Sequence, residues 1–375
     1  MDQSKFSTKL KKIDISGIRK MFESAGPEAI NLGLGQPDFD TPEHIKKAAI
    51  SAINDGFTGY TEGQGILELR EVLVNKFKRD NNLLFNPSDI IVTSGASEAL
   101  QIALASLIDQ NDEILVPNPG FVSYKALTDV LGGKSVPVPL SENLTLNPDE
   151  LLTYITPETK AFIINSPSNP TGGVQTKKDI RDFAQIADDY NITLISDEVY
   201  EHFIYEGEHV SPGIYSDNVI TINAVSKTFS MTGWRLGYVA ANETYINQML
   251  KVHQYVQACA SSISQKAAVA AINGPIDDVI KMRKEFQTRR DFLLKSLKSM
   301  GIDCVEPKGA FYAFPYVGDD YLNIVSNLLS KGVIVVPGSA FGDKGKGYIR
   351  ISYANSVENI KLAMEIMSDV IRHWC

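Results

Sequence analysis

Short apolar runs that alternate with helical patterns constrain the fold of this chain more than any other feature of its sequence. Each run has the length of a strand, and the segments between the runs have the periodicity of helices. The predicted strands are Asp89–Thr93, Glu113–Val116, Ala161–Asn165, Thr193–Ser196, Val219–Asn223 and Leu236–Ala240. The predicted helices are Ala96–Ile108, Val122–Leu131 and Lys177–Tyr190, with a further helix start at Asn147 and Pro148. This alternation is typical of an α/β fold with a parallel sheet.

The C-terminal third of the chain has a different pattern. The stretch from Glu243 to Met300 has helical character and no strand, and we expect it to connect two structural units. Beyond it, short strands alternate with helices, the last of which runs to about His373. These predicted strands are Phe311–Pro315, Val333–Val336 and Tyr348–Ser352. The pattern indicates a second, α+β unit.

The length of 375 residues allows two such units. Residues before about Pro42 are too few to build a core of their own, so we expect them to pack with the C-terminal unit. We therefore predict a large domain of residues 43–284 and a small domain built from residues 13–42 and 285–375. Residues 1–12 are polar and rich in lysine, and they are predicted to form an N-terminal arm.

Charge and composition exclude several classes of function. The net charge is −9, so the chain has no basic surplus to neutralise nucleic acid phosphates. It has no basic cluster for an anionic membrane surface, and no apolar run near the ~20 residues that a membrane span needs. We expect neither a nucleic acid nor a membrane as partner.

The cysteines and histidines indicate no disulfide framework and no metal site. Cys259, Cys304 and Cys375 are widely spaced, and no CxxC or Cys/His ligand spacing occurs. We expect His202 and His209 to be surface residues rather than ligands. The cytoplasm is the simplest compartment for such a chain.

Lys227 lies just after the apolar run from Val219 to Val225, and Arg235 lies eight residues later, beyond a Thr-Gly turn. A lysine at the end of a buried strand is costly unless it is neutralised or used covalently. Taken alone, it fits a surface lysine better. Further motifs change that balance: Asn165-Ser-Pro-Ser-Asn169-Pro-Thr-Gly-Gly173, Ile195-Ser-Asp197-Glu-Val-Tyr200 and Gly347-Tyr-Ile-Arg350-Ile-Ser-Tyr353.

In this order and at these separations, the motifs resemble the pyridoxal-phosphate-dependent aminotransferases of fold type I, in the class I/II family that includes aspartate and aromatic aminotransferases. The resemblance runs from about Ile30 to the last helix. It implies a large domain with a mainly parallel seven-stranded sheet between helices, plus a smaller α+β domain built from both chain ends. It also implies a homodimer that moves an amino group between an amino acid and a 2-oxo acid by a ping-pong route.

The resemblance assigns the chemistry to Lys227, Asp197 and Tyr200. Lys227 would form the Schiff base with the aldehyde of pyridoxal 5′-phosphate and then carry the proton from the substrate Cα. Asp197 would pair with the pyridine nitrogen, and Tyr200 together with Asn169 would reach the phenolic oxygen of the ring. In isolation, Asp197 also fits a capping or turn residue, and Asn169 fits a turn.

The resemblance also assigns the groups that hold the cofactor. The backbone of Gly95, Ala96 and Ser97 at a helix start would bind the phosphate, although a simple serine N-cap has the same sequence. Arg235 would supply positive charge. The two remaining cofactor contacts are Phe121, stacked on the pyridine unless it is a core residue, and Tyr60, which reaches the neighbouring subunit's phosphate.

The substrate α-carboxylate would bind Arg350, with Gly35 offering its backbone N–H, whereas Phe121 and Asn169 would also border the substrate. An exposed edge-strand arginine is the alternative for Arg350. The chain departs from the family at Ala224, where a serine or glycine is usual, so a hydroxyl contact to the phosphate is lost. Some aspartate-using relatives have a lysine at the position of Ser97, and no clamp for a distal carboxylate can be identified.

Substrate range therefore stays open between aspartate and aromatic amino acids. A carbon–sulfur β-lyase of the same fold would use the same lysine. A ligand-sensing module of a regulator would need an attached basic DNA-binding segment, for which there is no N-terminal room. A nicotinamide dehydrogenase is disfavoured because Gly33-Leu-Gly35 lacks the third glycine of a dinucleotide fingerprint.

Overall fold

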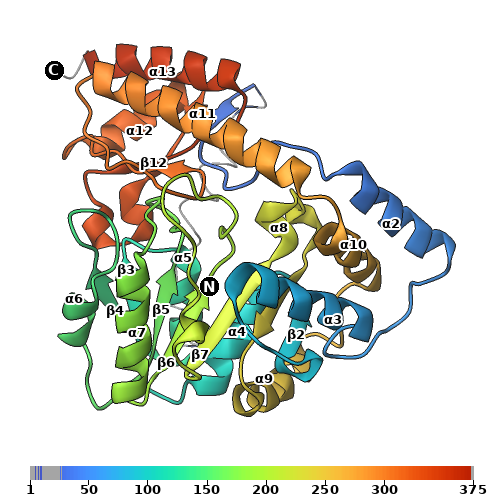
Figure 1. Ribbon diagram of the computed structural model, residues 1–375. Coiled ribbons are helices and arrows are strands. Elements are labelled where there is room, and N and C mark those ends of the chain that lie inside the picture. Colours follow the sequence, from blue (N-terminus) through green and yellow to red (C-terminus); the bar gives the residue numbers. More distant parts are fainter. Residues whose placement is uncertain (1–4, 6, 8, 11–25, 27, 373–375) are drawn as a thin grey trace.

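The computed structural model of the protein describes residues 5, 7, 9, 10, 26 and 28–372. Its centre is a seven-stranded sheet in the order β2-β8-β7-β6-β5-β3-β4 (Figure 1). The strands are β2 (Ile90–Thr93), β3 (Glu113–Asn118), β4 (Lys134–Pro139), β5 (Thr159–Asn165), β6 (Thr193–Asp197), β7 (Val219–Ala224) and β8 (Gly237–Ala240). Only β8 runs antiparallel to its neighbours. The expected mainly parallel α/β sheet is confirmed.

Strand β4 is the one member of this sheet that the sequence pattern missed. It lies at the edge of the sheet and pairs only with β3. Its sequence contains Pro137 and Pro139, which cannot donate to a ladder and are tolerated on edge strands. An edge position therefore explains why a proline-containing segment is a strand.

Helices cover both faces of the central sheet. Strand β5 shows why, because Ile163 packs with α4, α5 and α9, whereas Phe162 and Ile164 pack with α6 and α7. The covering helices are α4 (Ala96–Leu107), α5 (Val122–Leu131), α6 (Pro148–Leu152), α7 (Lys177–Asp189) and α9 (Glu243–Val256). The Asn147 side chain caps α6 as predicted. A strand buried on both faces is apolar throughout, which explains the unbroken apolar runs in the sequence.

The long helical stretch consists of three separate helices, α9, α10 (Ser262–Asn273) and α11 (Asp277–Ser299). Helix α10 packs on α2 (Glu43–Asn54) and α3 (Leu67–Lys76). The shorter helical elements are α8 (Val225–Thr228), a π-helix at Phe77–Asn81, and 3-10 turns at Pro87–Asp89, Pro212–Ile214, Thr232–Trp234, Gly338–Phe341 and Asp343–Gly345. No helix within the described part of the chain is long and apolar enough to span a membrane.

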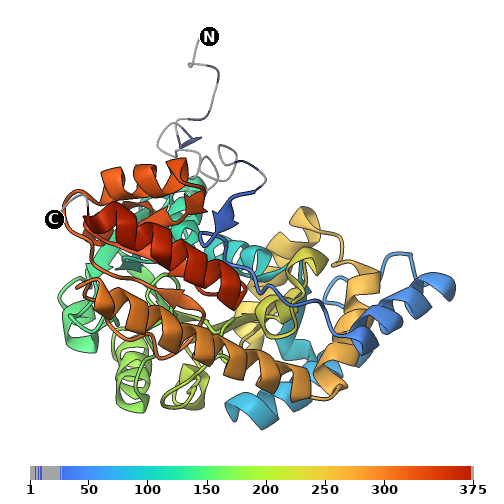
Figure 2. The same ribbon diagram turned by 90° about the horizontal axis from the view of Figure 1, so that it is seen from above.

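A smaller unit lies beside the central sheet and joins both ends of the described chain. Two small sheets form it: β11-β12-β9, made of Val336–Pro337, Ile349–Ser352 and Tyr312–Ala313, and β1-β10, made of Ile30–Asn31 and Val333–Ile334. The predicted strand Val333–Val336 is thus divided between two sheets. Helices α11, α12 (Tyr321–Ser330) and α13 (Val357–Arg372) cover them (Figure 2).

The N-terminal segment packs with this C-terminal unit, as its short length suggested. Ile30 and Leu32 donate backbone hydrogen bonds to Gly332 and Ile334 and join the core around Phe286. The domain boundaries proposed at residues 42 and 284 stay predictions. Residues 13–25 and most of the predicted N-terminal arm lie outside the described residues.

Candidate active site

A cavity of about 280 Å³ lies at the carboxyl ends of β5, β6 and β7, and β9 and β12 of the smaller unit also border it. It brings together most of the predicted site residues. These are Gly35, Ala96, Ser97, Phe121, Asn169, Asp197, Tyr200, Lys227, Arg235 and Arg350. Two predicted residues do not line the cavity of this chain: Gly95, which lies just behind it, and Tyr60, whose side chain is 91% exposed.

Lys227 is placed in the cavity by the short helix α8, which begins directly after β7. Its Nζ donates to the carbonyl oxygen of Gly35 over 2.5 Å. Burial lowers the pKa of Lys227 to about 8, and the positive charges of Arg350 and Arg235 act in the same direction. A much larger fraction of this amine is therefore neutral near physiological pH than in an ordinary lysine. A neutral amine is the form that attacks a carbonyl group.

Asp197 ends β6 and is buried in the same cavity. Burial raises the pKa of Asp197 to about 6, although the Tyr124 hydroxyl and the Val199 amide oppose this by donating hydrogen bonds to the carboxylate. The Tyr124 hydroxyl lies 2.7 Å from Oδ2. A buried carboxylate of this kind is stabilised by a cationic partner, such as a protonated ring nitrogen. Sequence reasoning missed Tyr124, although it lies one helical turn after Phe121.

The start of α4 forms the candidate phosphate end of the cavity. The Gly95 N–H donates to the carbonyl oxygen of Thr93 in this structure, and its contact with the phosphate stays a prediction. The first-turn amides of Ala96 and Ser97 have no partner within a helix and are suited to an anion. Gly95 matters for its lack of a side chain, because a Cβ there would lie 2.5 Å from Nη2 of Arg235. The guanidinium can therefore lie directly against the helix start.

Arg350 is buried in β12, the central strand of its sheet, so the exposed edge-strand alternative is wrong. Its Nη1 donates to Oδ1 of Asn169 over 2.9 Å, and its Nη2 donates to the carbonyl of Gly33. The rings of Tyr312 and Phe341 lie 4.6 and 4.8 Å from the guanidinium carbon. Its Nε is buried without a hydrogen-bond partner. A buried guanidinium with an unused donor fits a small anion.

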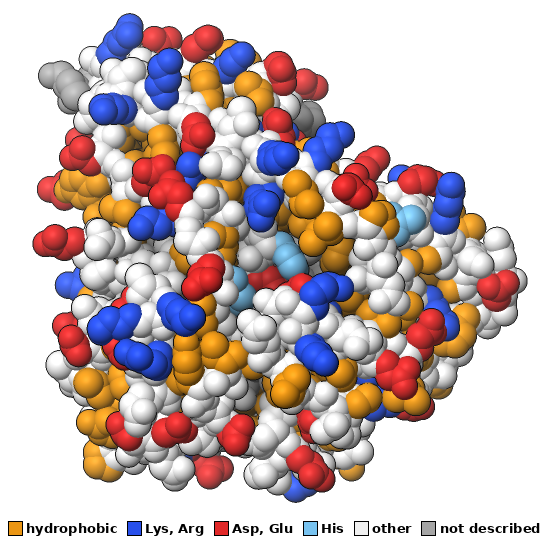
Figure 3. Space-filling view, in the orientation of Figure 1, with side chains coloured by type: hydrophobic (Ala, Val, Ile, Leu, Met, Phe, Trp, Pro, Cys, Tyr) orange, Lys and Arg blue, Asp and Glu red, His pale blue; other side chains and the backbone are white. Residues whose placement is uncertain are grey.

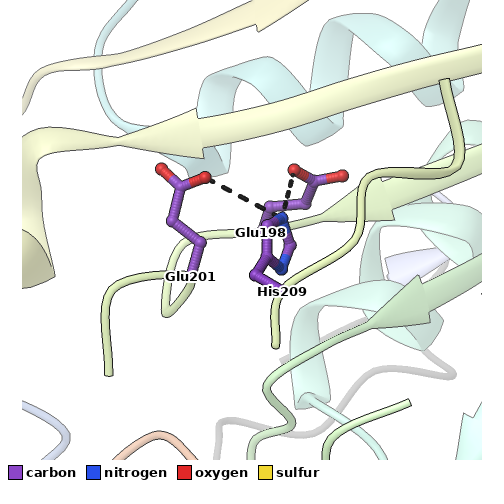
Figure 4. Close-up of side chains that lie close together, drawn as sticks. All are labelled: Glu198, Glu201 and His209. Atoms are coloured by element: carbon purple, nitrogen blue, oxygen red, sulfur yellow. Dashed lines mark hydrogen bonds and ion pairs between the residues drawn. The ribbon is translucent and has the colours of Figure 1, made fainter. Parts of the chain in front are cut away.

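A second set of largely buried side chains surrounds Glu198 and Glu201, and Figure 4 shows three of its members. Nε2 of His209 lies 2.9 Å from Glu198 and 3.8 Å from Glu201. Lys76 forms an ion pair with Glu201, and Asn81 donates to both glutamates. We call this group, with its residues Lys76, Asn81, Glu198, Glu201 and His209, the rear network.

The rear network overturns the expectation of surface histidines. The side chain of His209 is only 10% exposed and that of His202 is 19% exposed. Lys76, Glu201 and His202 also line a second cavity of about 230 Å³. Figure 3 shows a hollow with histidine and acidic side chains near the middle of the face. Glu198, Glu201 and His209 could group around a metal ion, but the Lys76 ammonium already supplies the positive charge there. The network instead holds the turn that carries Asp197.

The comparisons with known proteins agree with this geometry. The family model for class I and II aminotransferases matches residues 27–366. This chain belongs to the class I and II aminotransferase family. It is 45% identical over 372 residues to a probable aspartate aminotransferase of Methanocaldococcus jannaschii, covering 97% of this chain and 99% of that one. It is 44% identical over 382 residues to aromatic-amino-acid aminotransferase 2 of Thermococcus litoralis, covering 98% of both chains.

The structure of this aminotransferase is also similar to solved ones. The aspartate aminotransferase of Thermus thermophilus, determined with maleate, superposes with a TM-score of 0.93 at 36% identity. The match covers 97% of this chain and 99% of the other. The class I/II family consists of pyridoxal-phosphate-dependent enzymes, and the residues of the cavity fit that group. They offer a lysine, a buried carboxylate, and an arginine beside helix amides.

One residue offers a hydroxyl that the sequence reasoning did not consider. Ala224 lines the cavity and has none, as the departure from the family pattern indicated. Ser226, next to Lys227, also lines the cavity. The loss at Ala224 therefore does not leave this wall of the aminotransferase cavity without a side-chain hydroxyl.

Proposed function

We propose that this aminotransferase binds pyridoxal 5′-phosphate in the cavity around Lys227 and transfers an amino group between an L-amino acid and a 2-oxo acid such as 2-oxoglutarate. Aspartate is the first candidate donor and the aromatic amino acids are the second. A cytoplasmic location stays a prediction from the sequence.

The observation that carries this proposal is the meeting of Lys227, Asp197 and Arg350 in one cavity. These residues come from segments far apart in the sequence and are all largely buried. Burying ionisable groups together costs free energy unless they form ion pairs or hydrogen bonds with a ligand or with one another. A lysine with a lowered pKa, a carboxylate with a raised pKa and a guanidinium with an unused donor suit one amino-acid and cofactor site.

When bound, pyridoxal 5′-phosphate supplies the electron-withdrawing ring that weakens the Cα–H bond of an amino acid. Asp197 would keep a proton on the ring nitrogen. The amine of Lys227 would then take the proton from the substrate Cα, for which its pKa of about 8 is well matched. Arg350 would orient the substrate through its α-carboxylate, with the donors at Nε and Nη in one plane.

Substrate preference is argued from the relatives and from the cavity wall. The similar proteins are named as aspartate and as aromatic-amino-acid aminotransferases. The Thermus thermophilus enzyme was determined with maleate, which is a dicarboxylate. Ser97 lines the cavity here, and its short hydroxyl side chain leaves room that a lysine would fill. Both classes of substrate should therefore be tested together.

We further propose that two copies of the chain share their active sites. The Tyr60 side chain is 91% exposed and does not line the cavity of its own chain. Tyr255 is 86% exposed and Val256 is 45% exposed, which is unusual for side chains of this size. A two-fold dimer that covers such side chains would give two equivalent composite sites.

The test of the function is a product analysis with the purified protein, added pyridoxal 5′-phosphate and a panel of amino acids. We expect aspartate or aromatic donors to yield their 2-oxo acids only when 2-oxoglutarate is present, with glutamate formed in equal amount. Lys227→Ala serves as the matched control. Release of ammonia together with a 2-oxo acid when no 2-oxo acid acceptor has been added would instead identify a β-eliminating lyase.

A further inference from the structure

Tyr312 of β9 links the two halves of the candidate site. It is fully buried, lines the cavity, and comes from the smaller unit, whereas Lys227 and Asp197 come from the central sheet. In β9 it lies directly opposite Ser352 of β12. Ser352 and Arg350 are two residues apart, so their side chains lie on the same face of the strand. This register brings the ring of Tyr312 next to Arg350.

The first contact of Tyr312 is with the arginine. Its ring centroid lies 4.6 Å from the guanidinium carbon of Arg350, and the ring of Phe341 lies 4.8 Å from the same atom. A cation beside an aromatic face in a desolvated site is stabilised by the charge distribution of the ring. Two rings also restrict the planes that the guanidinium can adopt. Together they orient its donors before any anion binds.

The second contact of Tyr312 is with Tyr200. The two hydroxyl oxygens lie 2.8 Å apart. Burial raises the pKa of both phenols, so both hydroxyl groups keep their protons at neutral pH. One hydroxyl must therefore donate to the other. If Tyr200 donates its proton to the ring oxygen of the cofactor, the hydrogen bond between the tyrosines must come from Tyr312.

The position of the Tyr312 hydroxyl is fixed from a third side. It occupies the place where a side chain at Gly35 would begin, so any Cβ there would collide with it. The carbonyl of Gly35 meanwhile accepts from Lys227. On the other side of Arg350, Asn169 accepts from Nη1 and so keeps its amide group free to turn toward the cavity. Arg350 is thus connected to both side chains that are proposed to reach the cofactor's ring oxygen.

We propose that Tyr312 is a positioning residue that couples the carboxylate-binding arginine to the cofactor. Its ring would hold the plane of Arg350, and its O–H, donated to Tyr200, would strengthen the hydrogen bond that Tyr200 gives to the phenolic oxygen of the cofactor. This inference rests on the proposed function, because it requires pyridoxal 5′-phosphate in the cavity.

The test separates the hydroxyl from the ring. Each protein is loaded with pyridoxal 5′-phosphate, and the pH midpoint of the cofactor's visible absorption change is measured. The dissociation constant of maleate is measured from the same spectrum. Tyr312→Phe should raise the pH midpoint, because Tyr200 then gives a weaker hydrogen bond to the phenolic oxygen and the bound cofactor is protonated more readily. The same variant should change the dissociation constant of maleate less than about threefold. Tyr312→Leu should also weaken maleate binding by ~10-fold.

Phe341→Leu is the matched control, because the Phe341 ring also lies beside the guanidinium of Arg350 but has no hydroxyl that could bind Tyr200. It should weaken maleate binding without moving the pH midpoint. In a Tyr200→Phe background, Tyr312→Phe should cause no additional shift of that midpoint. The thermal unfolding transition of each variant is compared with that of the parent to check that the fold is retained.

Two results would overturn the inference: an unchanged midpoint in Tyr312→Phe, or a full additional shift in the Tyr200→Phe background. Either would leave the proposed function intact. If the parent protein itself gives no visible absorption with pyridoxal 5′-phosphate, the proposed function fails first, and the coupling fails with it.

Discussion

The hydroxyl of Tyr124 donates a hydrogen bond to Oδ2 of Asp197 over 2.7 Å, inside the buried end of the cavity. Tyr124 belongs to α5 and Asp197 ends β6, so a helix on one face of the sheet supports a carboxylate at its edge. Without this donor, burial would raise the pKa of Asp197 still further. The hydrogen bond therefore helps to keep the carboxylate charged near neutral pH.

Replacing Tyr124 with phenylalanine removes this donor and keeps the ring. A hydrogen bond to a charged group contributes about 1.5–3 kcal/mol, so we expect cofactor affinity to fall by roughly tenfold or more at neutral pH. As the solution is acidified, cofactor binding by the variant should weaken at a higher pH than cofactor binding by the parent. The reason is that Asp197 becomes protonated at a higher pH when the Tyr124 hydroxyl is absent. Fluorescence titration with pyridoxal 5′-phosphate from pH 5 to 8 measures both effects. Equal affinities across this range would show that Tyr124 does not support the charge of Asp197.

Arg350→Lys keeps the positive charge but loses the planar set of donors. The buried contacts with Asn169 and Gly33 depend on that plane, as does bidentate binding of a carboxylate. We expect kcat/KM to fall by about 10–100-fold for aspartate and for aromatic donors alike, because each has an α-carboxylate. A loss confined to dicarboxylic substrates would mean that Arg350 binds the substrate side chain instead.

The strands and the main site residues could be predicted from the sequence for one physical reason. In a parallel sheet the carboxyl ends of neighbouring strands meet at one edge, so polar residues directly after apolar runs come together there. Asn165 and Asp197 end β5 and β6 in this way, and Lys227 follows β7. Strand β4 was missed because its prolines are compatible only with an edge position.

Contacts made by packing between elements left no such signal in the sequence. Tyr312 reaches Arg350 only because of the register of β9 on β12, and it reaches Tyr200 only because the smaller unit lies beside the central sheet. The rear network likewise depends on the π-helix that ends α3 and carries Asn81 to Glu201. A charged residue buried by such packing cannot be distinguished by spacing from one at the surface.

The rear network predicts a pH dependence of stability. Burial opposes charge on His209, but the Glu198 and Glu201 carboxylates outweigh it and raise its pKa, while the positive charge of Lys76 opposes them. Its folded-state pKa therefore lies above the unfolded value of about 6.5. The stabilisation from protonated His209 is complete below that unfolded value and is lost as the pH rises through the raised pKa.

We accordingly expect His209→Gln to be less stable than the parent by about 1–3 kcal/mol near pH 6, with a smaller difference at pH 9. His202→Gln is the matched control, because the stability difference from the parent should have the opposite sign at acidic pH. Burial lowers the pKa of His202, so this histidine destabilises the fold only as the pH falls below about 6.5. Denaturant unfolding at pH 6 and pH 9 compares the three proteins. A deficit of His209→Gln that does not change with pH would rule out titration of His209 as its source.

Shared active sites can be tested by mixing two defective chains. Co-expression of Tyr60→Ala and Lys227→Ala chains gives mixed dimers, in which one site combines both lesions. The other site receives Lys227 from one chain and Tyr60 from its partner. Under limiting cofactor, the mixed dimer should be more active than either parent homodimer. Activity equal to the mean of the two homodimers would place Tyr60 within its own chain's site or outside any site.

The covalent attachment of the cofactor tests the central claim most directly. The protein is incubated with pyridoxal 5′-phosphate, reduced with borohydride and digested, and the modified peptide is identified by mass spectrometry. The position of Lys227 in the cavity and its pKa of about 8 predict a single modified residue, Lys227, and no label in Lys227→Ala. Stable modification of a different lysine in the parent protein, with Lys227 unmodified, would contradict the account.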